Sequence, residues 1–232
     1  TTPSSILDIR RADGSIRRLT VDHGSYRVPT VREVVDETST PMVHIPFFGS
    51  GTADALRGWL RSQRASKAVV IDIRDNGGGC LEEMIAAADL FLEPGSIVVN
   101  RGRDHNAMEP ISATQEAVWM GNVVVLVNRG TEGVAEAFSA ALRDNGRGLL
   151  VGTRTGGRSV DVSVYDAGRG FVLQVADTHL SAPSGASWSQ RGLAPNIIVE
   201  SSNIAIPVGG GGSMPDLQRD TALRLISTTS LH

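Results

Sequence analysis

The chain has 232 residues, of which 41% are hydrophobic, and a formal net charge of −3 at pH 7. This size suits one sizeable globular domain, alone or with a small appendage. Its arginines are scattered rather than clustered, which gives no sign of a nucleic-acid surface. No apolar run approaches the roughly 20 residues needed to cross a bilayer. A single cysteine excludes an internal disulfide. We therefore expect no nucleic acid, no membrane span and no disulfide.

The chain opens with a short β segment. Residues 4–22 predict two strands joined by a turn at residues 12–14, and residues 26–34 predict an extended connector that contains Pro29. Two strands alone are marginally stable in water. We therefore expect them to pack on the rest of the chain or on a missing partner.

From residue 42 onward, strands alternate with helices. Residues 68–73 and 122–128 are continuous β-branched runs, typical of strands covered on both faces. Repeated β–α units imply a mostly parallel sheet. The expected strands are 42–48, 68–73, 96–101, 122–128 and 148–152, and the expected helices are 50–63, 80–92 and 134–143.

The remaining segments are less regular. Residues 102–120 predict an irregular, lid-like excursion, whereas residues 160–166 and 171–177 predict a β-hairpin. Residues 209–213 are glycine-rich and predict a linker. Residues 215–226 then predict a terminal helix.

Three glycine-bearing motifs each follow an expected strand. Residues 75–79 read DNGGG and open a helix, where free backbone N–H groups and the helix dipole favour negative charge. Residues 130–136 read GTEGVAE after the second buried strand, and residues 152–158 read GTRTGGR after the next one.

In their order and spacing, these motifs resemble those of the carboxy-terminal processing (tail-specific) serine peptidases, over residues 40–200. The resemblance implies an α/β fold, the spiral of βαβ units shared by the Clp protease and crotonase superfamily, preceded by a partial PDZ-like β segment. It further implies that residues 1–27 are the remnant or C-terminal part of a PDZ-like domain and that residues 28–208 are the peptidase-like core. Residues 209–232 are then the linker and terminal helix.

The resemblance also assigns places in a catalytic site. Gly133 falls where the family has its serine nucleophile, Arg158 where it has its lysine base, and Val162 where it has the glutamine that orients the lysine. Gly78 and Gly79 fall in the oxyanion loop, where Gly77 replaces the family's proline.

Simple chemistry shows what these replacements remove. Gly133 has no side chain to attack a carbonyl, and arginine stays protonated and offers only donors. A serine–lysine dyad needs an amine that can lose its proton near neutral pH. Lys67 is the only lysine, and it lies in a connector between a helix and a buried strand. The sequence predicts that the usual dyad is absent.

Substitute groups leave alternatives open. Cys80, beside the glycine loop, is a possible nucleophile at a helix N-terminus or simply a packed residue, and His44 is its possible base or a structural histidine. Arg154 and Arg158 are either surface residues or binders of a peptide carboxylate. The histidines show no metal-ligand spacing, so we expect neither metal nor cofactor.

We therefore predict a non-proteolytic peptide- or protein-binding pseudopeptidase. The alternative is an active hydrolase with a rearranged site that uses Cys80 or a residue from another chain. A crotonase-like enzyme is the third reading, for which we find no placed acid or base. The expected partners are a protein C-terminus, an active homologue or the missing PDZ portion, and an oligomer is possible. The resemblance alone suggests an extracytoplasmic location.

Overall fold

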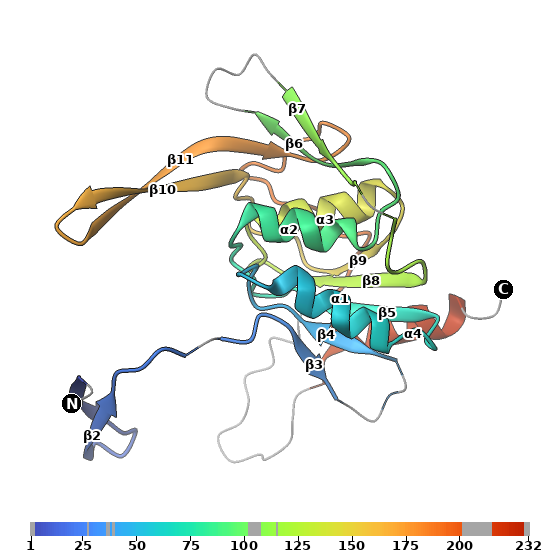
Figure 1. Cartoon of the computed structure of the whole chain (residues 1–232). Coiled ribbons are helices and arrows are strands. Elements are labelled where there is room, and N and C mark those ends of the chain that lie inside the picture. Colours follow the sequence, from blue (N-terminus) through green and yellow to red (C-terminus); the bar gives the residue numbers. More distant parts are fainter. Residues whose placement is uncertain are drawn as a thin grey trace.

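The computed structural model describes residues 3–26, 28–35, 38, 40–101, 108–114, 116–200 and 215–229. Its centre is a six-stranded sheet in the order β12-β9-β8-β5-β4-β3 (Figure 1). Neighbouring strands run parallel except β3 and β4, as the repeated β–α units predict. The strands are β3 (Arg32–Val34), β4 (Met42–His44), β5 (Ala68–Asp72), β8 (Asn122–Val127), β9 (Leu149–Gly152) and β12 (Ile197–Ile198).

Helices cover both faces of this sheet. One face packs against α1 (Thr52–Ser62), α2 (Leu81–Asp89) and α3 (Val134–Asp144), whereas α4 (Leu217–Thr229) covers the other face. All five residues of β5 are buried, which is the environment that its continuous apolar run predicts.

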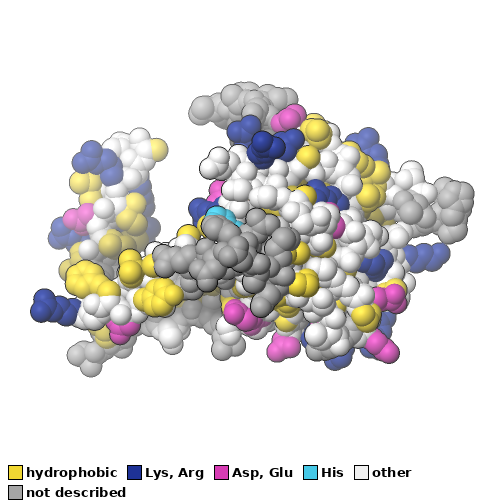
Figure 2. Space-filling model, turned by 90° about the horizontal axis from the view of Figure 1, so that it is seen from above, with side chains coloured by type: hydrophobic (Ala, Val, Ile, Leu, Met, Phe, Trp, Pro, Cys, Tyr) yellow, Lys and Arg dark blue, Asp and Glu magenta, His cyan; other side chains and the backbone are white. Residues whose placement is uncertain are grey.

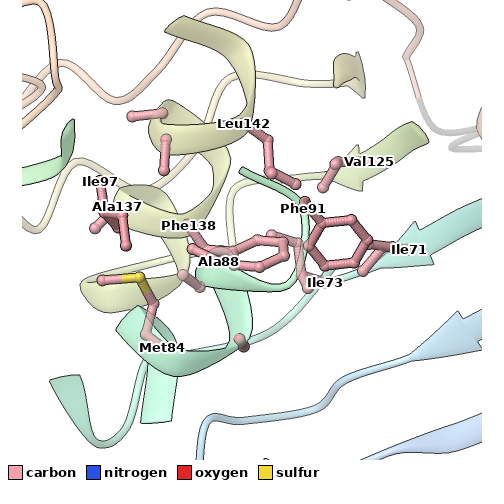
Figure 3. Packing of buried hydrophobic residues seen from close by; sticks show 14 of the residues in the cluster. Ile71, Ile73, Met84, Ala88, Phe91, Ile97, Val125, Ala137, Phe138 and Leu142 are labelled. Carbon is pink, nitrogen blue, oxygen red and sulfur yellow. The ribbon is translucent and has the colours of Figure 1, made fainter. Parts of the chain in front are cut away.

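The larger core lies between the sheet and the first three helices (Figure 3). Phe138 of α3 is fully buried, and its ring lies 5.4 Å from the ring of Phe48 and 6.1 Å from that of Phe91. Truncating such a residue to alanine costs about 3–5 kcal/mol of stability. This packing fixes α3, and with it the loop that precedes α3.

A second sheet, in the order β10-β11-β6-β7, packs on α2 and α3, which lie between it and the first sheet in Figure 1. It contains β6 (Ser96–Arg101), β7 (Met108–Ser112), β10 (Val160–Gly168) and β11 (Phe171–Ser181). The β10–β11 hairpin projects from the molecule in Figure 1. Its outer part exposes apolar side chains, including Val164, Tyr165, Phe171 and Val172, and Figure 2 shows hydrophobic side chains gathered at this projecting end.

Strands β1 (Ser4–Arg10) and β2 (Ile16–Asp22) pair only with each other in the part of the chain that the structure describes. Ile6 and Ile16 are 67% and 63% exposed. The predicted hairpin is thus present, and its origin in a PDZ-like domain stays a prediction. None of the described helices is long and apolar enough to cross a membrane.

Three local expectations differ from the structure. β4 ends at His44, and Phe48 instead forms an isolated bridge with Gly79. Residues 108–112, expected to be irregular, form β7 because they pair with β6. α1 begins at Thr52 rather than at residue 50, and the Glu83 carboxylate accepts the amides of Gly51 and Ala53 at this end of the helix. The predicted linker at residues 209–213 lies outside the described residues.

Candidate active site

The glycine loop after β5 is held by the amide of Asn76. Its Nδ2 donates to the Ile45 carbonyl and its Oδ1 accepts the Gly78 amide, both at 2.9 Å, and the side chain is fully buried. A Cβ at Gly79 would lie 2.1 Å from the Phe48 carbonyl oxygen. Only glycine therefore lets the loop approach the chain after β4 so closely.

Gly133 ends the turn between β8 and α3 and faces this loop. Its φ of 60° and ψ of −126° belong to a region that residues with a Cβ rarely adopt. A Cβ built there would lie 3.8 Å from the Cα of Gly78, so the space for a side chain exists. A strained turn from strand to helix is also where α/β-hydrolases present their nucleophile. The turn at Gly133 thus has an unusual backbone conformation and room for a side chain, but glycine supplies no nucleophile.

A buried carboxylate joins this turn to the loop after β9. Glu136 accepts the Gly133 amide at 3.1 Å, the Gly157 and Arg158 amides at 2.8 Å each, and the hydroxyl of Thr155. Burial raises the pKa of the Glu136 carboxyl, although these four donors oppose the shift. The network fixes the loop at residues 155–158 against the first turn of α3.

The positions assigned by resemblance meet in one crevice. Gly133, Arg158 and Val162 all line a cavity of about 270 Å³, together with the glycine loop; the remaining lining residues are Gly77, Gly78, Gly79, Val134, Val160, Val164 and Gln174. Gly79, Val162 and Val164 also line a neighbouring cavity that reaches Cys80 and Tyr165. We call the two cavities together the crevice.

The crevice offers backbone donors. Among the described residues, the amides of Gly79 and Val134 have no acceptor, whereas the Gly78 amide is bound to Asn76. Both residues line the crevice, and a backbone amide without an acceptor can donate to a peptide carbonyl oxygen. The oxyanion role predicted for the loop thus has a free donor at Gly79 rather than at Gly78.

No lysine is among the described residues that line the crevice. The guanidinium of Arg158 forms an ion pair with Glu132 at 2.9 Å. Lys67 directly precedes β5, whereas the glycine loop follows β5. A strand of five residues separates the two by about 16 Å. The only lysine is therefore at the opposite edge of the sheet.

The structure does not pair the two substitute residues. The thiol of Cys80 donates to the Glu82 carboxylate at 2.9 Å, and no contact with His44 is found in the described part of the chain. Burial, followed by the interaction with Glu82, raises the pKa of Cys80. A raised thiol pKa lowers the thiolate fraction at neutral pH, opposite to what a nucleophilic cysteine needs.

Arg154 lies apart from Arg158. It lines a separate cavity of about 400 Å³ on the far side of Glu132, where its Nη1 donates to the carbonyls of Arg191 and Gly192. The sequence motifs alone indicate no role in the site for Asn76, Glu132 or Glu136. Glu136 lies three residues after Gly133, which is the spacing of a capping box. This spacing predicts its contact with the Gly133 amide.

Residues 39–199, more than half of the chain, match the sequence model of Peptidase family S41. The chain belongs to Peptidase family S41. This confirms the predicted family and the predicted α/β, Clp protease-like fold class.

Relatives in the same family are similar over most of the chain. A carboxyl-terminal-processing protease of Picosynechococcus sp. is 28% identical over 92% of this chain and 52% of its own length. One from Bartonella bacilliformis is 32% identical over 58% of this chain and 31% of its own length. The solved photosystem II D1 C-terminal processing protease is 24% identical, with a TM-score of 0.65 over 86% of this chain and 56% of that one. The chain thus spans about half the length of these family S41 relatives or less.

Proposed function

We propose that this family S41 domain is a pseudopeptidase that binds a peptide without cleaving it. One observation carries the proposal: the crevice has Gly133 at the nucleophile-like turn and an ion-paired guanidinium, Arg158, at the place of a base. A glycine supplies no attacking atom, and a guanidinium accepts no proton near neutral pH.

The crevice retains groups that suit a peptide ligand. Val160, Val162 and Val164 alternate along β10, so their side chains share one face of the strand and line the crevice. Val162 and Val164 are 40% and 61% exposed. Apolar peptide side chains can cover them, while a peptide carbonyl can accept the free amides of Gly79 and Val134.

The relatives' names point to the class of peptide. Those proteins are named as processing carboxyl termini, so the proposed ligand is the C-terminal part of a polypeptide. An active homologue or a PDZ portion remains a proposed partner, and an extracytoplasmic location remains an inference from the family. The rearranged hydrolase using Cys80 receives no support from its thiol's environment.

Peptide binding with a matched pair of variants tests the proposal. Val162→Asp places a carboxylate in the crevice, whereas Val21→Asp changes a similarly exposed valine of β2, at 43% against 40%. A fluorescein-labelled peptide of alanine and valine should bind wild type and Val21→Asp alike. Val162→Asp should weaken binding by about tenfold because a charge is desolvated. Equal binding by all three proteins, or no binding by wild type, would refute the proposal.

A further inference from the structure

A second cavity, which we call the arginine pocket, adjoins the crevice. Its volume is about 400 Å³, and its lining is Arg129, Glu132, Arg154, Thr155, Gly156, Gln190 and Arg191. Three arginines and a single acidic residue thus line this cavity, although the whole chain has a net charge of −3. Such a local excess of positive charge favours an anionic ligand.

The one carboxylate in the arginine pocket is already neutralised. Glu132 Oε2 lies 2.9 Å from Arg158 Nη2, and Arg158 lines the crevice rather than the arginine pocket. In the part of the chain that the structure describes, no carboxylate pairs with Arg129, Arg154 or Arg191. The three guanidinium groups therefore lack an internal counterion.

Two loops bound together hold the arginine pocket in shape. Leu193 and Thr155 exchange hydrogen bonds, from the Thr155 amide to the Leu193 carbonyl at 3.1 Å and from the Leu193 amide to Thr155 Oγ1 at 2.7 Å. The Gln190 amide donates to the Gly157 carbonyl at 2.8 Å. Arg154 is itself anchored on the carbonyls of residues 191 and 192. A site held this way needs less ordering when it binds a ligand.

The Glu132–Arg158 ion pair separates the arginine pocket from the crevice. Glu132 lines the arginine pocket, Arg158 lines the crevice, and Gly133 directly follows Glu132. A peptide lying in the crevice beside Gly133 would therefore be separated from the three arginines only by the Glu132–Arg158 ion pair. A guanidinium binds a carboxylate through two parallel N–H donors.

We infer that the arginine pocket binds a carboxylate of the peptide whose chain occupies the crevice. This inference rests on the proposed function and adds an anionic requirement to it. The carboxylate has two possible sources, the terminus of the peptide or an acidic side chain near it, and both present the same planar acceptor to the arginines.

Three labelled peptides of one alanine–valine sequence test the inference. The first ends in a free carboxylate, the second in a neutral amide, and the third in an amide preceded by glutamate. Wild type should bind at least one charged peptide about tenfold more tightly than the neutral one, since hydrogen bonds to charged groups contribute about 1.5–3 kcal/mol. The tighter of the two charged peptides identifies the source of the carboxylate.

Matched double variants locate the effect. Arg129→Ala with Arg191→Ala should bring the charged-to-neutral affinity ratio close to one. Arg61→Ala with Arg64→Ala removes two exposed arginines elsewhere and should preserve that ratio. Circular dichroism checks that both variants are folded, and the neutral peptide reports crevice binding in each.

The possible outcomes separate the two proposals. Equal binding of all three peptides by wild type overturns the inference and leaves the proposed function standing. A charge preference that survives in the Arg129/Arg191 variant also overturns it, because the carboxylate then binds elsewhere. If no peptide binds wild type, the proposed function fails and the inference fails with it.

Discussion

The backbone amide of Arg158 donates a 2.8 Å hydrogen bond to the buried carboxylate of Glu136. This contact joins the loop after β9 to the first turn of α3, so two segments 22 residues apart in sequence share one fixed geometry. The other Glu136 oxygen accepts Thr155 and Gly157. The buried Glu136 carboxylate therefore fixes two segments that border the crevice, although Glu136 itself does not line the crevice.

Replacing this carboxylate should destabilise the fold. Glu136→Gln removes the acceptor capacity of one oxygen and should cost about 2–4 kcal/mol, since each buried donor left unpaired costs about 1–3 kcal/mol. Urea denaturation measures the loss. Glu93→Gln, at an exposed position, should change stability little.

The same carboxylate should make stability depend on pH. Burial raises the pKa of Glu136 in the fold, so its contribution is fully present below the ordinary glutamate pKa and is lost as pH rises through the raised value. Glu136→Gln should flatten the part of the profile that begins at the ordinary glutamate pKa and extends upward from it. An unchanged profile would show that Glu136 does not titrate there.

The Arg74 clamp should control the docking of α4. Its guanidinium contacts Asp72 at 2.7 Å and Asp216 at 2.8 Å, and it joins the end of β5 to the residue before α4. Arg74→Ala leaves the buried Asp72 without its partner and should cost about 3–5 kcal/mol. Limited proteolysis should then cleave near α4 first, whereas exposed Arg11→Ala should leave the cleavage pattern unchanged.

Acid should weaken the same clamp. Burial alone would raise the pKa of Asp216, but hydrogen bonds and the charge of Arg74 outweigh it and hold the pKa below its usual value. The clamp's contribution is thus present above the ordinary aspartate pKa and is lost as pH falls through the lowered value. Arg74→Ala should reduce the loss of stability in acid, and an unaltered acid limb would count against the clamp.

Cys80 should react slowly. Burial and the Glu82 carboxylate raise the pKa of its thiol, so alkylation at neutral pH should be slower than that of free cysteine. Glu82→Gln removes the opposing charge and should speed the reaction. Alkylation faster than that of free cysteine would revive the alternative of a nucleophilic Cys80.

Introducing the serine, lysine and glutamine of the resembling peptidases tests whether the crevice keeps the geometry of a peptidase site. Gly133→Ser, Arg158→Lys and Val162→Gln together should produce hydrolysis of an unfolded protein, because a Cβ at position 133 has room. The strained backbone there costs a serine about 1–3 kcal/mol of stability. The hydrolysis rate of the triple variant should exceed that of a control with Gly133→Ala, Arg158→Lys and Val162→Gln by at least about 10²-fold. Equal hydrolysis rates for the two folded variants would show that the crevice lacks the geometry of a working peptidase site.

Sequence patterns predicted the sheet well because burial on both faces leaves a clear signature. The β5 run has no polar residue before Asp72, and its neighbours repeat the pattern. The family resemblance assigned Gly133, Arg158 and Val162 to one site, and all three line one cavity in the structure.

The contacts that hold the site were harder to predict because they join distant residues. Glu83 caps α1 from 30 residues away, and Arg74 reaches Asp216 across 142 positions. No local pattern marks either contact. The arginine pocket is similar, because Arg129 and Arg191 come together only through the pairing of two loops.

The most direct test of the pseudopeptidase is a single-turnover hydrolysis assay with the wild-type chain in excess over an unfolded protein. Mass spectrometry would follow the substrate's C-terminus, and the Gly133→Ala variant would control for contaminating protease. The account predicts that the substrate's mass stays unchanged with both proteins. Cleavage by wild type that Gly133→Ala or alkylation of Cys80 abolishes would contradict it.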